Sequence, residues 1–260
     1  MNLFTSKLPL ADVGVNPMKF FRFLKSLPWL FSDYRNLYKQ LRGNKDFKIK
    51  RLFLIADDKY DSSGSATGHY FHQDLLVAQK IFKKNPERHI DIGSRVDGFV
   101  AHVAAFRKIE VLDIRPLENR TENIHFVQQD LMSGSEDFKE SADSMSCLHT
   151  IEHFGLGRYN DPIDVDGHIK GLSNMHTLLK KWGTFYFSTP IGSQRIEFNA
   201  HRVFSIDYLL ELFEGKYKLE TFSYVDDAGD LHKDINLTEK LIKNNCWCEF
   251  GCGIFELVKI

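Results

Sequence analysis

The stretch HIDIGSRVDG, residues 89–98, decides the fold class of this 260-residue chain. Its first half has the apolar pattern of a short buried strand and ends in Asp91 and Gly93. An apolar helical pattern, GFVAHVAAFR, follows at residues 98–107. A strand that passes through an acid and a glycine into a helix is typical of the first unit of a nucleotide-binding sheet. This stretch therefore predicts that further strands and helices alternate behind it.

That alternation continues to the C-terminus. Strand-like runs follow at 109–114 (IEVLDI), 124–131 (IHFVQQDL), 144–149 (SMSCLH) and 183–190 (GTFYFSTP). Two last strand-like runs, 216–225 and 247–260, have no dependable helical pattern between them. Parallel neighbouring strands need a helical crossover between them, whereas antiparallel neighbours can be joined by a turn. Strands that alternate with helices and end in a strand pair therefore predict an α/β fold. We expect a Rossmann-like doubly wound sheet, mostly parallel, with an antiparallel C-terminal strand.

A long helix is expected between the strands at 144–149 and 183–190. One face of it carries Ile169, Leu172, Met175, His176 and Leu179. Lys180, Lys181 and Gly183 have the character of a helix C-terminus, so we expect the helix to end there. A shorter helix is expected at 205–213, SIDYLLELF.

Charge is divided unevenly along the chain. Residues 1–50 hold 10 Lys or Arg against 3 Asp, a net charge of +7, and the remainder holds 24 basic and 32 acidic residues, a net charge of −8. Because the expected sheet domain, 85–260, is acidic, a nucleic-acid partner is not expected. Residues 1–84 are expected to form a helical N-terminal extension and lid.

The basic segment 18–42 places aromatic residues and leucines at helical spacing, with Pro28 dividing it into two short helices. It can lie on a membrane surface or pack on its own domain or on a second copy of the chain, and packing is favoured over peripheral membrane contact. No secretory leader pattern and no membrane-spanning run is visible, so a cytoplasmic location is expected.

The four cysteines fit a reducing compartment. Cys246, Cys248 and Cys252 cluster near the C-terminus, but their spacing matches no common zinc pattern, so buried thiols are expected. A metal site built from His69, His72, Asp74 and His201 is a less favoured alternative. The sequence thus predicts no metal.

Polar residues stand where each parallel strand is expected to end, the edge at which such sheets bind ligands. The candidate cofactor-binding residues at these ends are Asp91, Gly93, Ser94, Arg95, Asp113, Ile114, Asp130, Leu131 and His149. Asp113 lies 22 positions after Asp91, where a carboxylate can accept both hydroxyl protons of a ribose. A lone Asp after a strand is also a common helix cap, and the recurrence at successive strands favours a site.

Arg95 and Asp97 bear on which cofactor the expected site binds. A nicotinamide site needs glycines so that the backbone can approach a pyrophosphate, and Arg95 and Asp97 stand where glycines belong. Asp97 would repel phosphate. A nucleoside without phosphate fits better, and acidic residues suit the positive sulfonium of S-adenosylmethionine. We expect Asp91 at its amino end, Asp113 at its ribose, and Leu131 with Asp130 at its adenine.

The motifs HIDIG, VLDI, QQDL, CLHTIEHFGLGRY and GTFYFSTP have the order and spacing of class I S-adenosylmethionine-dependent methyltransferases, which residues 85–260 resemble. The motifs SGSATGHYFHQD, DIGSRVDGFVAH, IEHFGLGRYNDP and FNAHRVFS resemble an uncharacterised bacterial methyltransferase-like family found near surface-polysaccharide genes. The resemblance implies methyl transfer to a small molecule such as a sugar, nucleotide-linked or phosphorylated precursor of a surface polysaccharide or capsule.

A hydroxyl acceptor needs a base with a pKa near neutrality, which favours histidine. His153 is the first candidate, on the loop that borders the transferred methyl group in this fold. His201 is the second and His72 the third, and Tyr159 and Arg202 lie beside them in the sequence. Each histidine can instead fix a loop by hydrogen bonding, and Arg195 and Arg202 can bind phosphate or pair with acids.

Two other functions stay open. One is a non-catalytic methyltransferase-like binding subunit, which Arg95 and Asp97 make plausible. The other is a nucleotide-dependent oxidoreductase or epimerase, which the missing glycines and the lack of a Tyr-x-x-x-Lys pair in a helix disfavour. A homo-oligomer is compatible with all three.

Overall fold

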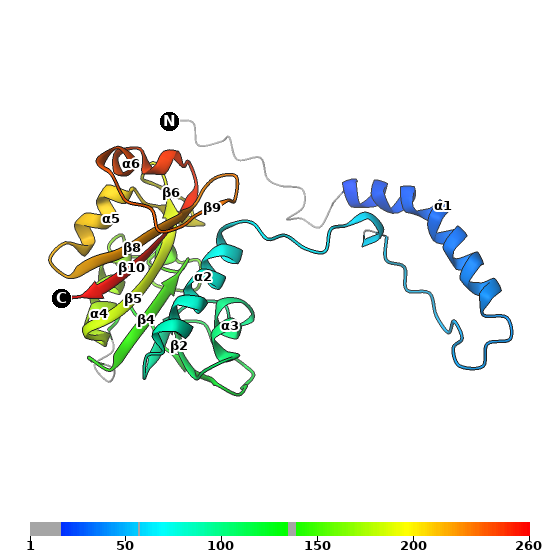
Figure 1. Ribbon diagram of the computed structural model, residues 1–260, viewed down its shortest axis with the longest axis horizontal. Coiled ribbons are helices and arrows are strands. Elements are labelled where there is room, and N and C mark those ends of the chain that lie inside the picture. Colours follow the sequence, from blue (N-terminus) through cyan, green and yellow to red (C-terminus); the bar gives the residue numbers. More distant parts are fainter. Residues whose placement is uncertain (1–16, 57, 135–138) are drawn as a thin grey trace. The chain divides into compact units, whose positions relative to one another are not determined.

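The computed structural model describes residues 17–56, 58–134 and 139–260 (Figure 1). The chain divides after Ser65 into two compact units, and the second, Ala66–Ile260, contains the sheet. Residues 1–16, on which the expectation of no secretory leader rests, lie outside the described residues.

The second unit is built on an eight-stranded sheet in the order β3-β2-β1-β4-β5-β10-β8-β9. The strands are β1 (His89–Ile92), β2 (Ile109–Asp113), β3 (Ile124–Gln128), β4 (Ala142–Leu148), β5 (Leu179–Ile191), β8 (Tyr217–Val225), β9 (Leu231–His232) and β10 (Gly251–Lys259). Strands β3, β2, β1, β4 and β5 pair in parallel. β10 lies between β5 and β8 and is antiparallel to both. The predicted doubly wound sheet with an antiparallel C-terminal strand is confirmed.

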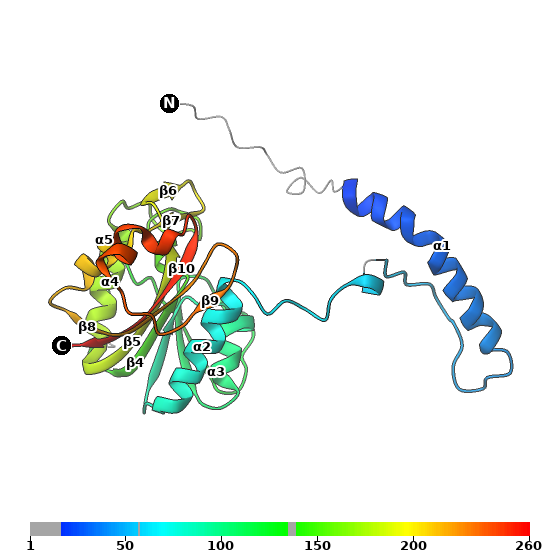
Figure 2. The ribbon, with the colours of Figure 1, turned by 45° about the horizontal axis from the view of Figure 1, so that its top comes forward.

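Helices cover both faces of this sheet (Figures 1 and 2). They are α2 (His69–Lys84), α3 (Ala101–Ala104), α4 (Gly167–Leu178), α5 (Ile206–Phe213) and α6 (Glu239–Lys243). α2 and α3 pack into one apolar core, and α4 and α5 into the other. In β5 the buried side chains alternate between the cores, with Phe185 and Phe187 in one and Tyr186 in the other. This alternation follows from the two-residue period of a strand.

Short elements complete the second unit. Single-turn segments lie at Val96–Val100 (η3), Ile151–His153 (η5) and Asn245–Trp247 (η6), and β6 (Arg195–Glu197) pairs with β7 (His201–Val203) as a separate two-stranded sheet. The helix α6 between the last two long strands was not visible in the sequence. Its five residues are too few to show a helical period, and Thr238 caps it by accepting a bond from the Leu241 amide.

The predicted end of the helix before β5 is wrong. α4 ends at Leu178, and Leu179 is already the first residue of β5. Leu179 is fully buried and pairs with Ala142 of β4, so its backbone bonds go to the sheet. The basic residues that looked like a helix end therefore belong to a strand, where Lys180 Nζ lies 2.7 Å from Asp143 Oδ1.

The boundary between the two units differs from the expected one at 84/85. The second unit begins at Ala66 because α2 is bound to the sheet. Lys80 Nζ and Lys84 Nζ lie 2.7 and 2.8 Å from the Glu256 carboxylate of β10. Ser188 of β5 also donates a 2.5 Å hydrogen bond to Gln73 of α2. The segment that carries GHYFHQD is thus part of the sheet unit.

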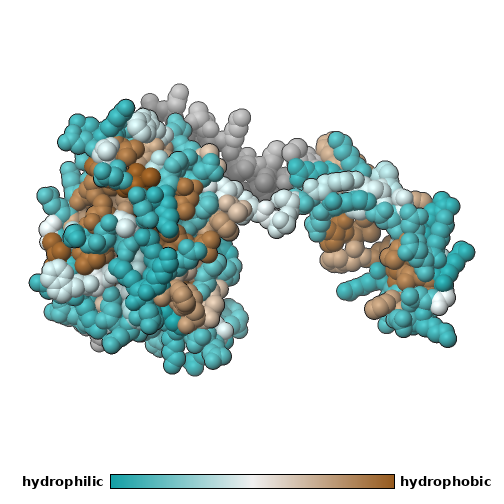
Figure 3. Space-filling model, viewed as in Figure 1, coloured by the Kyte–Doolittle hydropathy of each residue, from teal (hydrophilic) through white to brown (hydrophobic). Residues whose placement is uncertain are grey.

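The first unit contains α1 (Pro17–Gln40) and the short 3-10 turn η2 (Asp58–Tyr60). α1 is one helix that passes through Pro28, so the predicted break is wrong. A proline removes one backbone hydrogen bond, and the turns on either side of it remain helical here. The helix exposes Phe20, Phe21 and Phe31, and Figure 3 shows apolar side chains on the surface of this unit. None of the described helices is both long enough and apolar enough to cross a membrane.

Candidate functional site

A hollow that is partly open to solvent lies at the carboxyl ends of the parallel strands. Its wall contains residues from the ends of β1, β2, β3 and β4 and from the loop after β4. Eight of the predicted site residues line it: Gly93, Asp113, Ile114, Asp130, Leu131, His149, His153 and Tyr159. The sheet edge thus brings together most of the residues that the sequence placed at strand ends.

Gly93 follows β1 with a positive φ of 71°. A side chain at this position would meet Thr150 Cγ2 at 2.3 Å, because the loop after β4 approaches the backbone there. Only glycine adopts this conformation without strain and leaves room for that loop. The close approach keeps the floor of the hollow open beside β1.

Asp91 lies in β1, two residues before Gly93, and is not among the residues that line the hollow. It is fully buried, and its carboxylate accepts bonds from the Ser94 amide at 3.0 Å, the Ser94 hydroxyl at 2.9 Å and the Ser146 hydroxyl at 2.5 Å. Burial raises its pKa to about 7, against the opposing effect of these hydrogen bonds. Asp91 and Ser94 therefore hold the loop, and the expected contact of Asp91 with the amino end of the cofactor is not seen in this arrangement.

Asp113 at the end of β2 faces the hollow but already has a partner. Arg115 Nη2 lies 2.5 Å from Asp113 Oδ2, and Arg115 Nε lies 3.0 Å from Oδ1. The same guanidinium donates to the Gly93 carbonyl at 3.1 Å and stacks over the Tyr159 ring at 4.8 Å. A ribose that binds Asp113 must share the carboxylate with Arg115 or displace it.

The loop after β3 supplies an apolar wall and a self-capped acid. Asp130 accepts from the Met132 amide at 2.8 Å and from the Ser133 hydroxyl at 3.1 Å. Leu131 is buried, and its carbonyl accepts a 2.6 Å bond from Asn174 of α4. These bonds fix the turn that carries Leu131 and Asp130, the two residues expected at the adenine.

Arg95 is not among the residues that line the hollow, and it pairs with Asp97. Nε and Nη2 of Arg95 lie 3.0 and 2.7 Å from the two Asp97 oxygens, and both side chains are mostly exposed. This mutual pairing raises the pKa of Arg95 and lowers that of Asp97. The two residues that depart from the glycine pattern thus neutralise each other away from the hollow.

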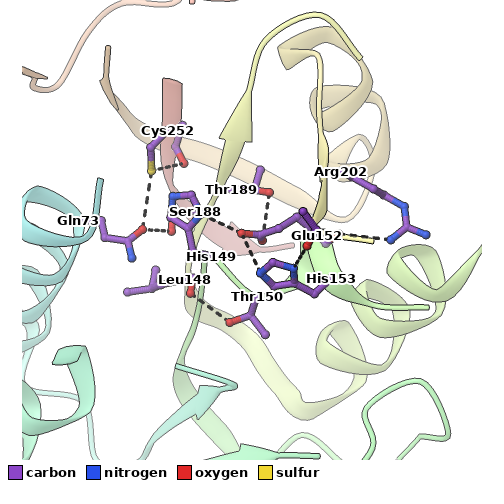
Figure 4. Close-up of polar contacts among 12 residues, drawn as sticks. Gln73, Leu148, His149, Thr150, Glu152, His153, Ser188, Thr189, Arg202 and Cys252 are labelled. Atoms are coloured by element: carbon purple, nitrogen blue, oxygen red, sulfur yellow. Dashed lines mark hydrogen bonds and ion pairs between the residues drawn. The ribbon is translucent and has the colours of Figure 1, made fainter. Parts of the chain in front are cut away.

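The loop after β4 gathers a buried polar group around Glu152 (Figure 4). His149 Nδ1 lies 2.8 Å from Glu152 Oε1, and His153 Nε2 lies 3.7 Å from the same oxygen. Burial favours a raised pKa for Glu152, but His149 and His153 bring it below its usual value. Glu152 is therefore a buried carboxylate held ionised by two imidazoles.

His153 is arranged to accept a proton. Its Nδ1 lies 2.7 Å from the carbonyl of Ala200, which can only accept, so Nδ1 carries the hydrogen and Nε2 has the lone pair. Burial lowers the pKa of His153, with Arg158 and His149 acting in the same direction and Glu152 and the Ala200 carbonyl against it. A neutral imidazole at the wall of the hollow is the form that a general base requires.

Tyr159 is placed by a tight loop. Asp161 accepts from the Tyr159, Gly155 and Gly157 amides at 3.0, 2.8 and 3.1 Å. The Tyr159 ring meets His153 edge-on, with 5.3 Å between ring centroids. Asp161 thus orders the segment that carries Tyr159 to the hollow.

Three predicted catalytic residues, all described, are not among those that line the hollow. Arg202 is buried and donates to the Phe154 carbonyl at 2.5 Å and to the Val165 carbonyl at 3.3 Å, so it holds the loop after β4. His201 packs on Phe250 at 4.9 Å, and His72 packs edge-on against Phe71. Arg195 pairs with Glu197 at 2.8 Å instead of facing the hollow.

A second cluster adjoins His149. Among the described residues, His69, His149 and Cys252 have side-chain ligand atoms that all lie within 4.8 Å of one another. Of the set considered from the sequence, only His69 belongs to it. All four cysteines are buried and free, as the sequence predicts.

The sequence missed several wall residues. Arg115 and Thr150 stand two and one positions from predicted residues, and Tyr70 lies inside the GHYFHQD motif. An arginine two residues after a strand-end acid is a local signal for the Asp113 pair. The contact of Tyr70 with His149, 5.1 Å between ring centroids, joins segments far apart in the sequence and carries no such signal.

Comparison with known families gives one match. The model of DUF268, described as "Caenorhabditis protein of unknown function", matches residues 100–249. The description gives no reaction, and it names Caenorhabditis where a bacterial family was expected. A comparison with curated protein sequences found no match.

Solved structures resemble the sheet unit at low sequence identity. 1,6-didemethyltoxoflavin-N1-methyltransferase of Burkholderia thailandensis, crystallised with S-adenosylhomocysteine, is 14% identical with a TM-score of 0.52, covering 94% of this chain and 91% of that one. The [4+2]-cyclase SpnF is 11% identical with a TM-score of 0.51, covering 72% and 80%. These similarities confirm the Rossmann-like methyltransferase fold, and the second shows that this fold also serves another reaction.

Proposed function

This chain belongs to the DUF268 family, and we propose that it is an S-adenosylmethionine-dependent methyltransferase acting on a small molecule. The observation that carries the proposal is the hollow at the strand ends, where Gly93, Asp113 and Leu131 meet His153. It combines a backbone that a ligand can approach closely, an acid for a ribose diol, an apolar wall for a base and a neutral imidazole. In the similar structure from Burkholderia thailandensis the bound molecule is S-adenosylhomocysteine.

The residues fit the cofactor at each part. Asp113 at the end of β2 can accept from both ribose hydroxyls, because a carboxylate has about four lone-pair sites and Arg115 leaves some of them free. Ile114 and Leu131 offer apolar surface to the adenine, and His149 with Gly93 borders the methionine side. Ser94 and Arg95 are proposed at the carboxylate end, where Arg95 can exchange Asp97 for the ligand.

S-adenosylmethionine supplies a methyl group activated by a positive sulfur. His153 Nε2 accepts the proton of the acceptor hydroxyl as its oxygen gains the methyl group, and the Glu152 carboxylate stabilises the imidazolium that results. Tyr159 orients the acceptor against His153. The buried loop contacts of Arg202 keep His153 in place, so we propose Arg202 as a positioning residue.

A sugar, nucleotide-linked or phosphorylated acceptor, such as a surface-polysaccharide precursor, is the finer proposal. Two guanidinium groups support it, because Arg115 and Arg158 both stack on Tyr159, at 4.8 and 5.2 Å from the ring. A phosphate prefers such planar donors. Tyr70, at the start of α2, lines the hollow and supports the proposal that the GHYFHQD segment acts as a lid over the acceptor.

Two measurements test the function. Mass spectrometry of small molecules released from the purified protein is expected to find S-adenosylhomocysteine or S-adenosylmethionine. The protein is then incubated with S-adenosylmethionine and a pool of sugar nucleotides and phosphorylated sugars. We expect release of S-adenosylhomocysteine and a mass gain of about 14 Da, the net addition of one CH₂, in one member of the pool. Recovery of a dinucleotide, or failure to bind S-adenosylhomocysteine at millimolar concentration, would contradict the proposal.

A further inference from the structure

We propose that His69, His149 and Cys252 bind one divalent metal ion of the zinc class beside the hollow. The three residues come from the start of α2, the end of β4 and the second position of β10. Their ligand atoms lie within 4.8 Å of one another. In a tetrahedral zinc site with Zn–N near 2.0 Å and Zn–S near 2.3 Å, such atoms are about 3.3–3.8 Å apart. Small side-chain rotations therefore close the site.

His149 has the surroundings of a metal-binding histidine. Its side chain is 5% exposed, Nδ1 is bonded to Glu152 at 2.8 Å, and Nε2 is buried without a hydrogen-bond partner. A metal-binding histidine usually donates its other ring hydrogen to a carboxylate, which orients the ring and fixes the tautomer. Glu152 supplies that carboxylate. An unpartnered buried nitrogen in this setting points to a ligand that the protein atoms do not supply.

His69 lies directly against His149. The two rings stack with 5.2 Å between centroids and 14° between planes. A hydrogen bond to the Phe250 backbone engages one side of His69. The other ring nitrogen of His69 can then turn toward His149 Nε2 and Cys252 Sγ, with which it forms the cluster.

Cys252 supplies the soft ligand. It is fully buried, and its Sγ lies 3.7 Å from the Gln73 side-chain carbonyl oxygen, 3.9 Å from the Gly253 carbonyl oxygen and within 4.8 Å of the His69 and His149 nitrogens. A ligand set of thiolate and imidazole favours zinc over magnesium or calcium. A Cys252 thiolate and the Glu152 carboxylate together balance a divalent charge.

The cluster leaves one coordination position for a water molecule or a substrate atom, as in catalytic zinc sites. His149 also lines the hollow, so an ion bound to it lies next to the proposed acceptor site. The competing explanation is a metal-free network in which Cys252 bonds to His149 and to Gln73, and Ser188 bonds to Gln73. A zinc titration separates the two, because the metal-free network binds no Zn²⁺. The metal site does not depend on the proposed methyl transfer.

The test uses the full chain, purified with a non-thiol reductant and stripped of metal. We expect it to bind one Zn²⁺ per chain in competition with a chromophoric chelator. Co²⁺ loading is expected to give visible bands of a tetrahedral site together with a near-ultraviolet thiolate-to-cobalt band. Cys252→Ser should abolish the thiolate band and weaken Zn²⁺ binding at least a hundredfold. His69→Ala should weaken binding similarly, and Glu152→Gln about 10–100-fold.

Matched variants separate the site from its neighbours. Cys248→Ser removes another buried thiol near β10, and His72→Ala removes another histidine of α2, and neither should change affinity or the cobalt spectrum. Circular dichroism of each metal-free variant checks that it folds. Wild-type protein that binds no Zn²⁺ more tightly than about 100 µM, a cobalt spectrum without a thiolate band, or affinity lost in Cys248→Ser but kept in Cys252→Ser would overturn the proposal. The wild-type titration decides the question even if a variant does not fold.

Discussion

The two sides of the hollow are held together over very different distances along the chain. At the ends of β2 and β3, Asp113 and Asp130 are each bonded to residues two or three positions away. At the end of β4, His153 bonds to Ala200, 47 positions on, and His149 lies against His69, 80 positions before it. The two acids on the proposed cofactor side are thus held by local turns, and the loop after β4, which carries the proposed base, is held by tertiary packing. Substitutions on the two sides should therefore have separable effects.

The largest expected effect is on the acceptor side. His153→Ala should reduce turnover about 10²–10⁴-fold, because the acceptor hydroxyl loses its base. Affinity for S-adenosylhomocysteine should stay within about twofold, since no ribose or adenine contact is removed. The measurement is S-adenosylhomocysteine release on an active acceptor, with calorimetry of the ligand in parallel. His125→Ala, at an exposed histidine on β3, is the matched control.

The pH dependence of that turnover has a defined direction. His153 must be neutral to accept a proton, and burial lowers its pKa below the usual 6.5. Turnover should therefore stay constant as pH falls from 7.5 and drop only below about 6.5. An acid limb with a midpoint above 7 would assign the base to another group.

The next prediction concerns the buried carboxyl of Asp91, which holds the loop after β1. Its pKa in the folded state is raised to about 7 from an ordinary value of 3.8. The stability from its protonated form is complete below pH 3.8 and is lost as pH rises through 7. Relative to wild type, Asp91→Asn should gain on the order of 3 kcal/mol of unfolding free energy between pH 4 and pH 7.5. Denaturant unfolding at several pH values measures this, and a difference that is flat with pH would show that Asp91 is ionised throughout.

Gly93 tests the point where the two sides meet. Gly93→Ala should cost roughly 2 kcal/mol or more, because φ is +71° and the new Cβ would meet Thr150 Cγ2 at 2.3 Å. Gly215→Ala has a similar φ of +67° with open space around it, so it isolates the clash. Thermal unfolding of both variants measures the difference, and equal destabilisation would remove the steric argument.

The smallest expected effect concerns the arginine over Asp113. Arg115→Ala frees the buried Asp113 carboxylate for a ribose, and an ion pair whose arginine is 38% exposed contributes on the order of 1 kcal/mol. Affinity for S-adenosylhomocysteine should rise about two- to fivefold, a change within reach of calorimetry. Arg95→Gly, which breaks the exposed pair with Asp97, should leave it unchanged or lower it. A tenfold loss in Arg115→Ala would make the guanidinium a ligand contact.

The sequence predicts which residues gather at the hollow where these residues end successive strands. The alternating pattern places Gly93, Asp113 and Leu131 at one edge before any contact is known. The acceptor side was predicted in part, since His153 and Tyr159 follow β4 directly. The distant supports of this loop were not predicted, because Ala200 against His153 and His69 against His149 come from other elements.

Two positions differ from the sequence expectation for the same physical reason. Arg202 is expected at the ligand-binding edge because it follows β5, but tertiary packing buries it against the loop carbonyls. Leu179 fits a helical period and yet pairs with Ala142 in the sheet. The local sequence pattern indicates where a helix or strand lies, and long-range contacts decide what each side chain packs against or bonds to.

The most direct test of the central claim is calorimetry of S-adenosylhomocysteine with wild-type protein and with Asp113→Ala. The account predicts one site per chain in the wild type and an affinity at least tenfold lower in the variant, because ionic hydrogen bonds to the ribose contribute roughly 1.5–3 kcal/mol each. The unfolding midpoint should change by only a few degrees, since the pair with Arg115 is partly exposed. Equal affinity in the two proteins, or no binding by the wild type, would contradict the assignment of this hollow.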